Sequence, residues 1–92
     1  MIAKKIIYTG AIDLATALAM FDVTRKIEIT GEVEFKLKNA TNENTVELRL
    51  EGDPANIKLV QHQIERCHPK SIKGKEVVAL AFHNYQSLNF LQ

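Results

Sequence analysis

Apolar and polar residues alternate strictly along two neighbouring stretches in the middle of the chain. In residues 26–38 and again in residues 45–51, every second side chain is apolar, with Gly31 as the one gap, and the others are charged or polar. A period of two is typical of a strand with one buried and one solvated face. The segment 39–44 between them is polar, so the two stretches predict a β-hairpin.

The charges on the polar face predict a register for this hairpin. One pairing sets Lys36 against Glu47 and Glu34 against Arg49, and each such pair contributes roughly 0.2–1 kcal/mol. A shift by two residues instead places Glu34 directly opposite Glu47, which is unfavourable. We therefore expect the charge-matched register. On the apolar face it pairs Leu37 with Val46, Phe35 with Leu48 and Val33 with Leu50.

Two helices are predicted, one on each side of the hairpin. The first begins after Asp13, a favourable N-cap residue, has apolar residues at three- and four-residue spacing, and ends near residues 22–24. The second follows Gly52-Asp53-Pro54, because aspartate caps a helix and proline suits its first position. It stops before Pro69. Its apolar stripe consists of Ile57, Val60, Ile64 and Cys67.

Two further apolar runs complete the predicted elements. Residues 4–9 lack alternation, as expected for a strand near the centre of a sheet, and residues 76–82 are apolar on both sides. The order is then βαββαβ. Right-handed crossovers predict an α+β, ferredoxin-like split-βαβ sandwich, in which a four-stranded antiparallel sheet carries two helices on one face. We expect residues 26–38 to form an edge strand of this sheet.

The composition fits a single domain spanning residues 1–92. Hydrophobic residues make up 46% and charged residues 25%, and 92 residues leave room for one core. Residues 85–92 form a C-terminal extension, for which three roles fit: pairing at a sheet edge, covering the core or contacting another subunit. Together with the long edge strand, it predicts a homo-oligomer or a protein partner. The expected interaction surface is Leu88, Phe90 and Leu91.

Charge and motif content disfavour several other partners and locations. Twelve Lys plus Arg against eleven Asp plus Glu give a net charge of +1, so we expect neither nucleic acid nor a membrane surface as a partner. We find no signal peptide and no membrane span, and we predict a cytoplasmic protein. Asn39-Ala40-Thr41 is a glycosylation sequon, which we interpret as a polar turn.

The sequence predicts no metal site and no cofactor. His62, Cys67 and His68 are close along the chain, but on a helix His62 and Cys67 point in different directions. Cys67 belongs to the apolar stripe, so we expect a buried, unreactive thiol.

Residues 9–82 resemble the acylphosphatases, whose fold is this same sandwich. The most similar stretches are Val46-Glu47-Leu48-Arg49-Leu50-Glu51-Gly52-Asp53 and His68-Pro69-Lys70-Ser71-Ile72. The family's activity depends on a phosphate-binding loop after the first strand, Gly-x-Val-Gln-Gly-Val-x-Phe-Arg, and on a water-orienting asparagine of the second strand. The resemblance therefore implies an anion- or ligand-binding loop. It consists of Thr9, Gly10, Ala11, Ile12 and Asp13.

The residues that carry the family's chemistry are replaced in this chain. The arginine falls on Leu18, the second glycine on Leu14 and the asparagine on Phe35, unless Asn39 or another loop asparagine takes its place after a shift of register. Asp13 would occupy the helix N-terminal amides that bind phosphate, and residues 11–24 contain no Lys or Arg. We therefore predict no catalytic residues and expect a domain that acts by protein contact or self-association. Two alternatives remain, namely a weak or atypical acylphosphatase and a regulatory module for a small ligand, phosphorylated or not.

Overall fold

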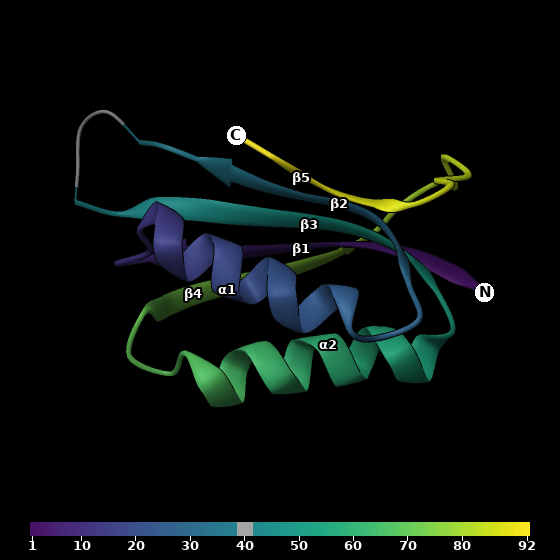
Figure 1. Ribbon diagram of the computed structural model, residues 1–92, viewed down its shortest axis with the longest axis horizontal. Coiled ribbons are helices and arrows are strands. Elements are labelled where there is room, and N and C mark those ends of the chain that lie inside the picture. The colour runs from purple at the N-terminus through teal and green to yellow at the C-terminus, as the bar shows by residue number, and fades with distance from the viewer. Residues whose placement is uncertain (39–41) are drawn as a thin grey trace.

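The computed structural model describes residues 1–38 and 42–92, in which five strands and two helices follow one another as β1, α1, β2, β3, α2, β4 and β5 (Figure 1). The predicted turn at Asn39-Ala40-Thr41 lies outside the described residues. The helices are α1 (Leu14–Arg25) and α2 (Pro54–Cys67). The strands are β1 (Ile2–Gly10), β2 (Thr30–Lys36), β3 (Asn44–Gly52), β4 (Ile72–Ala79) and β5 (Leu88–Leu91).

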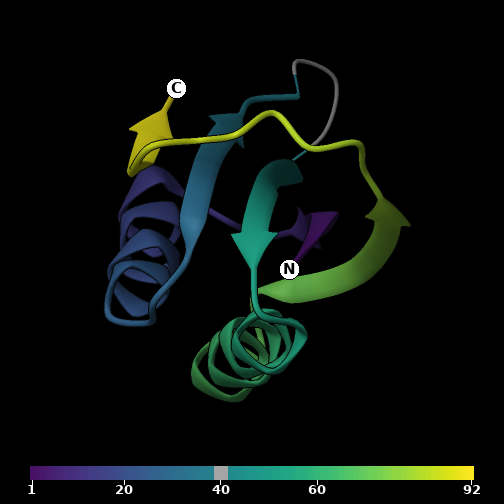
Figure 2. The same cartoon turned by 90° about the vertical axis from the view of Figure 1, so that its right-hand side faces the viewer.

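The strands form one sheet in the order β4-β1-β3-β2-β5, and both helices lie on the same face of it (Figure 2). The first four strands pair antiparallel, whereas β5 runs parallel to β2. The predicted α+β, ferredoxin-like arrangement is therefore confirmed. The prediction of only four antiparallel strands is wrong, because the C-terminal residues add a fifth, parallel strand.

Strand β2 is shorter than predicted and is not an edge strand. Helix α1 continues to Arg25 and is capped by Lys26, so the strand begins at Thr30. Ile27 and Ile29 continue the alternating pattern because they lie in the connection and pack against the core. Since β5 pairs along the other side of β2, the outer strands of the described sheet are β4 and β5.

The hairpin register is shifted by two residues from the charge-matched prediction, which is therefore wrong. Glu34 lies directly opposite Glu47, and Val33 lies opposite Leu48. Arg49 explains why this pairing is tolerated, since its Nη2 donates to Glu34 (2.9 Å), its Nε to Glu32 (3.1 Å) and its Nη1 to Glu47. One guanidinium thus binds three carboxylates, and the ammonium of Lys36 adds a second positive charge 3.4 Å from Glu47. A shift by two also keeps the same side chains on the apolar face.

Both predicted helix starts are confirmed. The Asp13 carboxylate accepts the Thr16 N–H (2.7 Å), and the Asp53 carboxylate accepts the Ala55 N–H (2.8 Å). Cys67 is exposed, however, so the predicted buried thiol is wrong. It is the last residue of α2, at the point where the chain leaves the helix.

The core lies between the sheet and the two helices. Tyr8 of β1, which lies between β4 and β3, is fully buried there, and its hydroxyl donates to Glu65 of α2 (2.9 Å). The last antiparallel strand, β4, covers residues 72–79 rather than 76–82, and it contributes Ile72 to the partly buried residues that pack against this core. The buried apolar residues of the core are Ile6, Tyr8, Ile12, Ala17, Met20, Val33, Phe35, Val46, Leu48, Leu50, Ile57, Val60 and Ile64.

Candidate functional site

The loop between β1 and α1 does not present all of its predicted ligand-binding residues to one site. Thr9 and Gly10 belong to β1 and pair with β3 on one side and β4 on the other. A side chain at Gly10 would lie 1.9 Å from the carbonyl oxygen of Ser71, so glycine is needed for this close approach. Ala11 is exposed, and the Ile12 side chain is buried in the core. Asp13 lines a cavity at the start of α1.

Asp13 occupies the N-terminus of α1 with its own carboxylate. Its Oδ1 accepts the Thr16 N–H, and its carbonyl oxygen accepts the Ala17 N–H (3.0 Å). The hydrogen bond from Thr16 holds the pKa of Asp13 below its usual value, so this carboxylate is ionised at neutral pH. A fixed negative charge therefore lies where a helix N-terminus would otherwise attract an anion.

Asn44, the first residue of β3, fastens this loop to the hairpin. Its Nδ2 donates to the Ile12 carbonyl (2.8 Å), and its Oδ1 accepts the Lys38 N–H (3.2 Å). The sequence pattern does not predict this role, because Asn44 is the last residue of the polar segment between the two alternating stretches. The signal that was available is its position immediately before the alternating run of β3.

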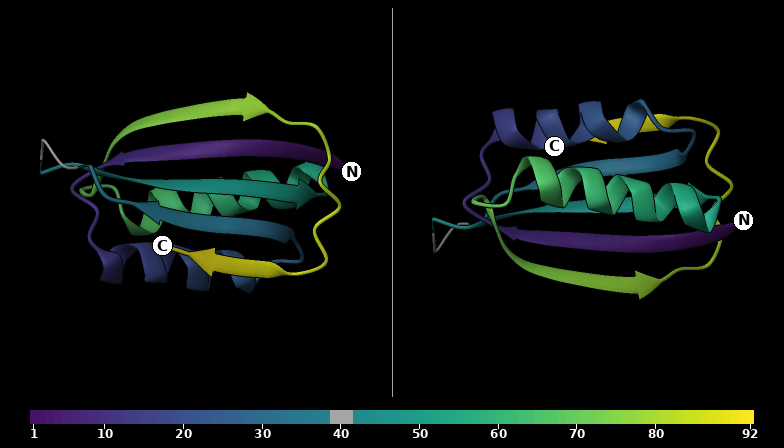
Figure 3. Two further views of the ribbon diagram at one scale, coloured as in Figure 1. Left: turned by 90° about the horizontal axis from the view of Figure 1, so that it is seen from above. Right: turned by 90° about the horizontal axis from the view of Figure 1, so that it is seen from below.

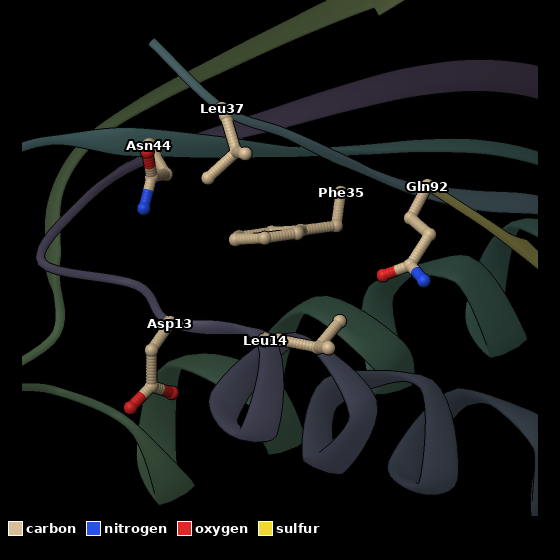
Figure 4. A pocket seen from close by; sticks show the side chains of 6 residues that line it. All are labelled: Asp13, Leu14, Phe35, Leu37, Asn44 and Gln92. Atoms are coloured by element: carbon tan, nitrogen blue, oxygen red, sulfur yellow. The ribbon is translucent and has the colours of Figure 1, made fainter. Parts of the chain in front are cut away.

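A cavity of about 490 Å³ lies between the start of α1, the end of β2 and the C-terminus (Figure 4). The ring of Phe35 lies in its middle, with Leu37 on one side and Leu14 on the other. Leu37 is 72% exposed, whereas Phe35 is only 8% exposed. Among the described lining residues, Asp13 alone has an ionisable side chain. The lining residues are Asp13, Leu14, Phe35, Leu37, Asn44 and Gln92.

The positions onto which the sequence resemblance places the family's arginine, second glycine and asparagine hold apolar side chains, namely Leu18, Leu14 and Phe35. Leu14 and Phe35 line the cavity, and Leu18 is exposed one turn further along α1. Such a cavity can hold an apolar group. Its described lining offers no Lys or Arg to neutralise a phosphate.

The predicted interaction surface at the C-terminus is used within the chain. Strand β5 pairs with β2, which confirms the first of the three expected roles. The ring of Phe90 lies edge-on to that of Phe21, with 5.7 Å between the ring centres, and Leu88 also packs against the core. Contact of Leu88, Phe90 or Leu91 with another subunit stays a prediction.

The described part of the chain was also compared with the requirements of a metal site and of a membrane-spanning helix. Within residues 1–38 and 42–92, no three His, Cys, Asp or Glu side chains are grouped so that they would hold a metal ion. In the same ranges, neither helix has the length and apolar character needed to cross a membrane.

Neither a protein-family model nor a curated protein matches the chain, whereas several solved structures do. The acylphosphatase of Bacillus subtilis superposes with a TM-score of 0.81 at 15% identity, over 100% of both chains. An acylphosphatase of Coxiella burnetii gives 0.74 at 10% identity, over 97% of this chain and 90% of the other. Full-length HypF, in its phosphate- and nucleotide-bound form, gives 0.80 at 16% identity, over 100% of this chain and 12% of HypF. The resemblance to acylphosphatases is thus confirmed as one of fold, and this chain has the acylphosphatase fold.

Proposed function

We propose that this domain uses the acylphosphatase fold for self-association rather than for the hydrolysis of acyl phosphates. The observation that carries the proposal is the exposed apolar end of the outer strand β4, which follows the charged residues Lys73, Lys75 and Glu76. Val77 is 40% exposed, Val78 is 39% exposed, and Phe82 just beyond the strand is 52% exposed. Natural sheets usually protect an outer strand with charges or proline, because its free backbone groups accept another strand, and residues 77–79 at the end of β4 carry neither. Pairing with a second chain would cover these side chains.

The loop between β1 and α1 supports the part of the proposal that sets hydrolysis aside. The ionised Asp13 repels a phosphate, and Leu18 replaces the guanidinium that would hold it. Loss of such a clamp on a transferring phosphoryl group costs several kcal/mol of transition-state stabilisation.

Size-exclusion chromatography with light scattering over a concentration series tests the proposal. We expect the molar mass to rise from that of one chain towards that of two. A mass of one chain at every concentration would overturn it.

A second candidate function is acyl-phosphate hydrolysis, and the likeness to two acylphosphatase structures favours it. Benzoyl phosphate, whose hydrolysis is followed by absorbance, separates this candidate from the first. We expect no turnover above the buffer rate. Turnover that disappears in an Asp13→Asn variant, which keeps a capping residue, would show that the loop is catalytic and would reverse the order of the two candidates.

A third candidate is the binding of a small ligand, which the cavity around Phe35 favours. A cavity of about 490 Å³ falls within the size range of small-molecule sites. The apolar lining and the charge of Asp13 favour an uncharged ligand over an anion. Amide chemical shifts recorded with benzyl alcohol and with benzoate test this, and Leu37→Ser should weaken binding whereas Leu59→Ser on α2 should not.

A further inference from the structure

The outer side of β4 has free backbone groups at defined positions. Among the described strands β4 pairs with β1 alone, and no other ribbon follows its outer side (Figure 3). The Leu80 N–H donates to the Ala3 carbonyl (3.0 Å). Hydrogen-bonded residues alternate along an antiparallel pair, so Val78 and Glu76 also bond to β1. The N–H and C=O groups of residues 75, 77 and 79 therefore point outward.

The side chains of β4 add an apolar surface on both faces of this edge. Val77 lies opposite Ile6, which faces the helices, and Val78 lies opposite Lys5, which faces the other way. Both valines are about two-fifths exposed. A strand that paired here would cover both of them.

Charge restricts how a second copy of β4 pairs with the first. Neighbouring antiparallel copies are related by a two-fold axis perpendicular to the sheet, so one residue faces its own equivalent. An axis at Lys75 or at Glu76 places like charges directly opposite each other, which is unfavourable. An axis at Val77 instead places Glu76 opposite Val78 and Lys75 opposite Ala79 of the second copy.

The same axis also makes the fullest use of the strand. With Val77 at the centre, residues 75–79 of both copies pair, and the outward groups of residues 75, 77 and 79 all find partners. With Val78 at the centre, Lys75 and Glu76 would face residues beyond Ala79, where β4 ends. Lys75 keeps its ion pair with Glu65 of its own copy, at 3.0 Å, on the helical face.

We infer that two copies of this chain join through β4 into one continuous ten-stranded sheet, with Val77 of one copy opposite Val77 of the other. This inference rests on the proposed function and adds to it the surface, the partner and the register. The partner is a second copy because, with Val77 at the centre, the charged Lys75 and Glu76 face the apolar Ala79 and Val78 of the other strand and the outward backbone groups of residues 75, 77 and 79 all find partners.

A charge at the centre of the contact tests which surface is used. Val77→Lys places two lysines opposite each other and should abolish the two-chain species in light scattering. Leu59→Lys is the matched control, because Leu59 is 43% exposed on α2 and its substitution by lysine adds the same charge. It should leave association unchanged, and circular dichroism checks that both variants fold.

Cysteine cross-linking tests the register. In a Cys67→Ser background, Val77→Cys brings two Cα atoms to about 5.5 Å, which a disulfide spans. Val78→Cys leaves its two copies on a diagonal, about 7–8 Å apart. We expect the first variant to form a disulfide-linked dimer on mild oxidation and the second to remain monomeric.

The outcomes separate this inference from the proposed function. A two-chain species that survives Val77→Lys, or that cross-links equally through Val78→Cys, overturns the inference and leaves self-association standing. A single-chain mass for the unaltered protein at every concentration overturns both.

Discussion

The carboxylate of Glu51 accepts the backbone N–H of Tyr85, 34 positions later in the chain, at 2.9 Å. It also accepts the N–H groups of His83 and Asn84. Asn84 has a left-handed backbone with φ of 64°, and this turn lets three successive N–H groups converge on one carboxylate. Glu51 is only 4% exposed, so a single buried side chain holds the connection that carries β5 to its place beside β2.

We expect Glu51→Gln to lower the free energy of unfolding at pH 7 by about 1–3 kcal/mol. Burial acts to raise the pKa of Glu51, but the three N–H donors outweigh it, and the pKa lies below its usual value. The stabilisation is therefore present above the unfolded pKa of about 4.3 and is lost as the pH falls through the folded pKa. Urea unfolding over this pH range measures both effects. Glu28→Gln, an exposed control, should leave the free energy of unfolding at pH 7 unchanged. A Glu51→Gln deficit of equal size at acidic and neutral pH would contradict this account.

Arg49 should matter more to the sheet than any one of the carboxylates around it. Without its guanidinium, Glu34 and Glu47 face each other directly, and only the half-exposed ammonium of Lys36, 3.4 Å from Glu47 and 3.9 Å from Glu34, lies beside both of them. We expect Arg49→Met to lower the free energy of unfolding by about 1–3 kcal/mol. Arg49→Lys should recover part of this loss, because an ammonium does not reach three carboxylates with fixed geometry. Urea unfolding measures these differences, with Arg66→Met on α2 as the control. An equal loss in that control would mean that net charge, rather than this network, is responsible.

The same arginine shows where sequence reasoning about the fold succeeded and where it failed. Periodicity located the elements because burial repeats every two residues in β2 and β3 and roughly every three to four in α2. The predicted register of the β2–β3 hairpin was wrong because it considers only charges that lie directly opposite each other, whereas Arg49 also reaches Glu34 on the diagonal. The prediction that β2 is an edge strand was wrong for a different reason. The four residues of β5 are too few to be predicted as a strand, and the strand they pair with is far away in the sequence.

At the candidate site, local features were predictable and tertiary ones were not. Asp13 was identified as the cap of α1 because capping depends on residues within one turn. The cavity, by contrast, combines α1, the end of β2 and Gln92, which reaches it only because β5 returns along the sheet.

Both tyrosines of the chain should ionise above the ordinary tyrosine pKa of about 10. Burial, helped by the bond to Glu65, raises the pKa of Tyr8, and burial with a bond to Glu32 raises that of Tyr85. The stability that each contributes is present below about pH 10 and is lost as the pH rises towards the folded pKa. Ultraviolet titration should therefore show that tyrosinate forms together with alkaline unfolding. The Tyr85→Phe variant, in which Tyr8 is the remaining tyrosine, should show the same. Half-ionisation of Tyr8 near pH 10 in folded protein would contradict the buried Tyr8–Glu65 contact.

Asp13 and Leu18 together should decide whether the loop after β1 accepts an anion. Asp13→Asn keeps a good capping residue while removing the negative charge, and Leu18→Arg places a guanidinium one turn along α1. We expect the double variant to bind inorganic phosphate in calorimetric titrations where the unaltered protein does not, because a helix N-terminus with a nearby guanidinium attracts anions. Asp13→Asn with Leu59→Arg is the matched control, since the net charge changes equally and Leu18 and Leu59 are 42% and 43% exposed. Equal binding by both double variants would mean that net charge alone governs anion affinity. Binding of phosphate by the unaltered protein would remove the electrostatic reason for setting hydrolysis aside.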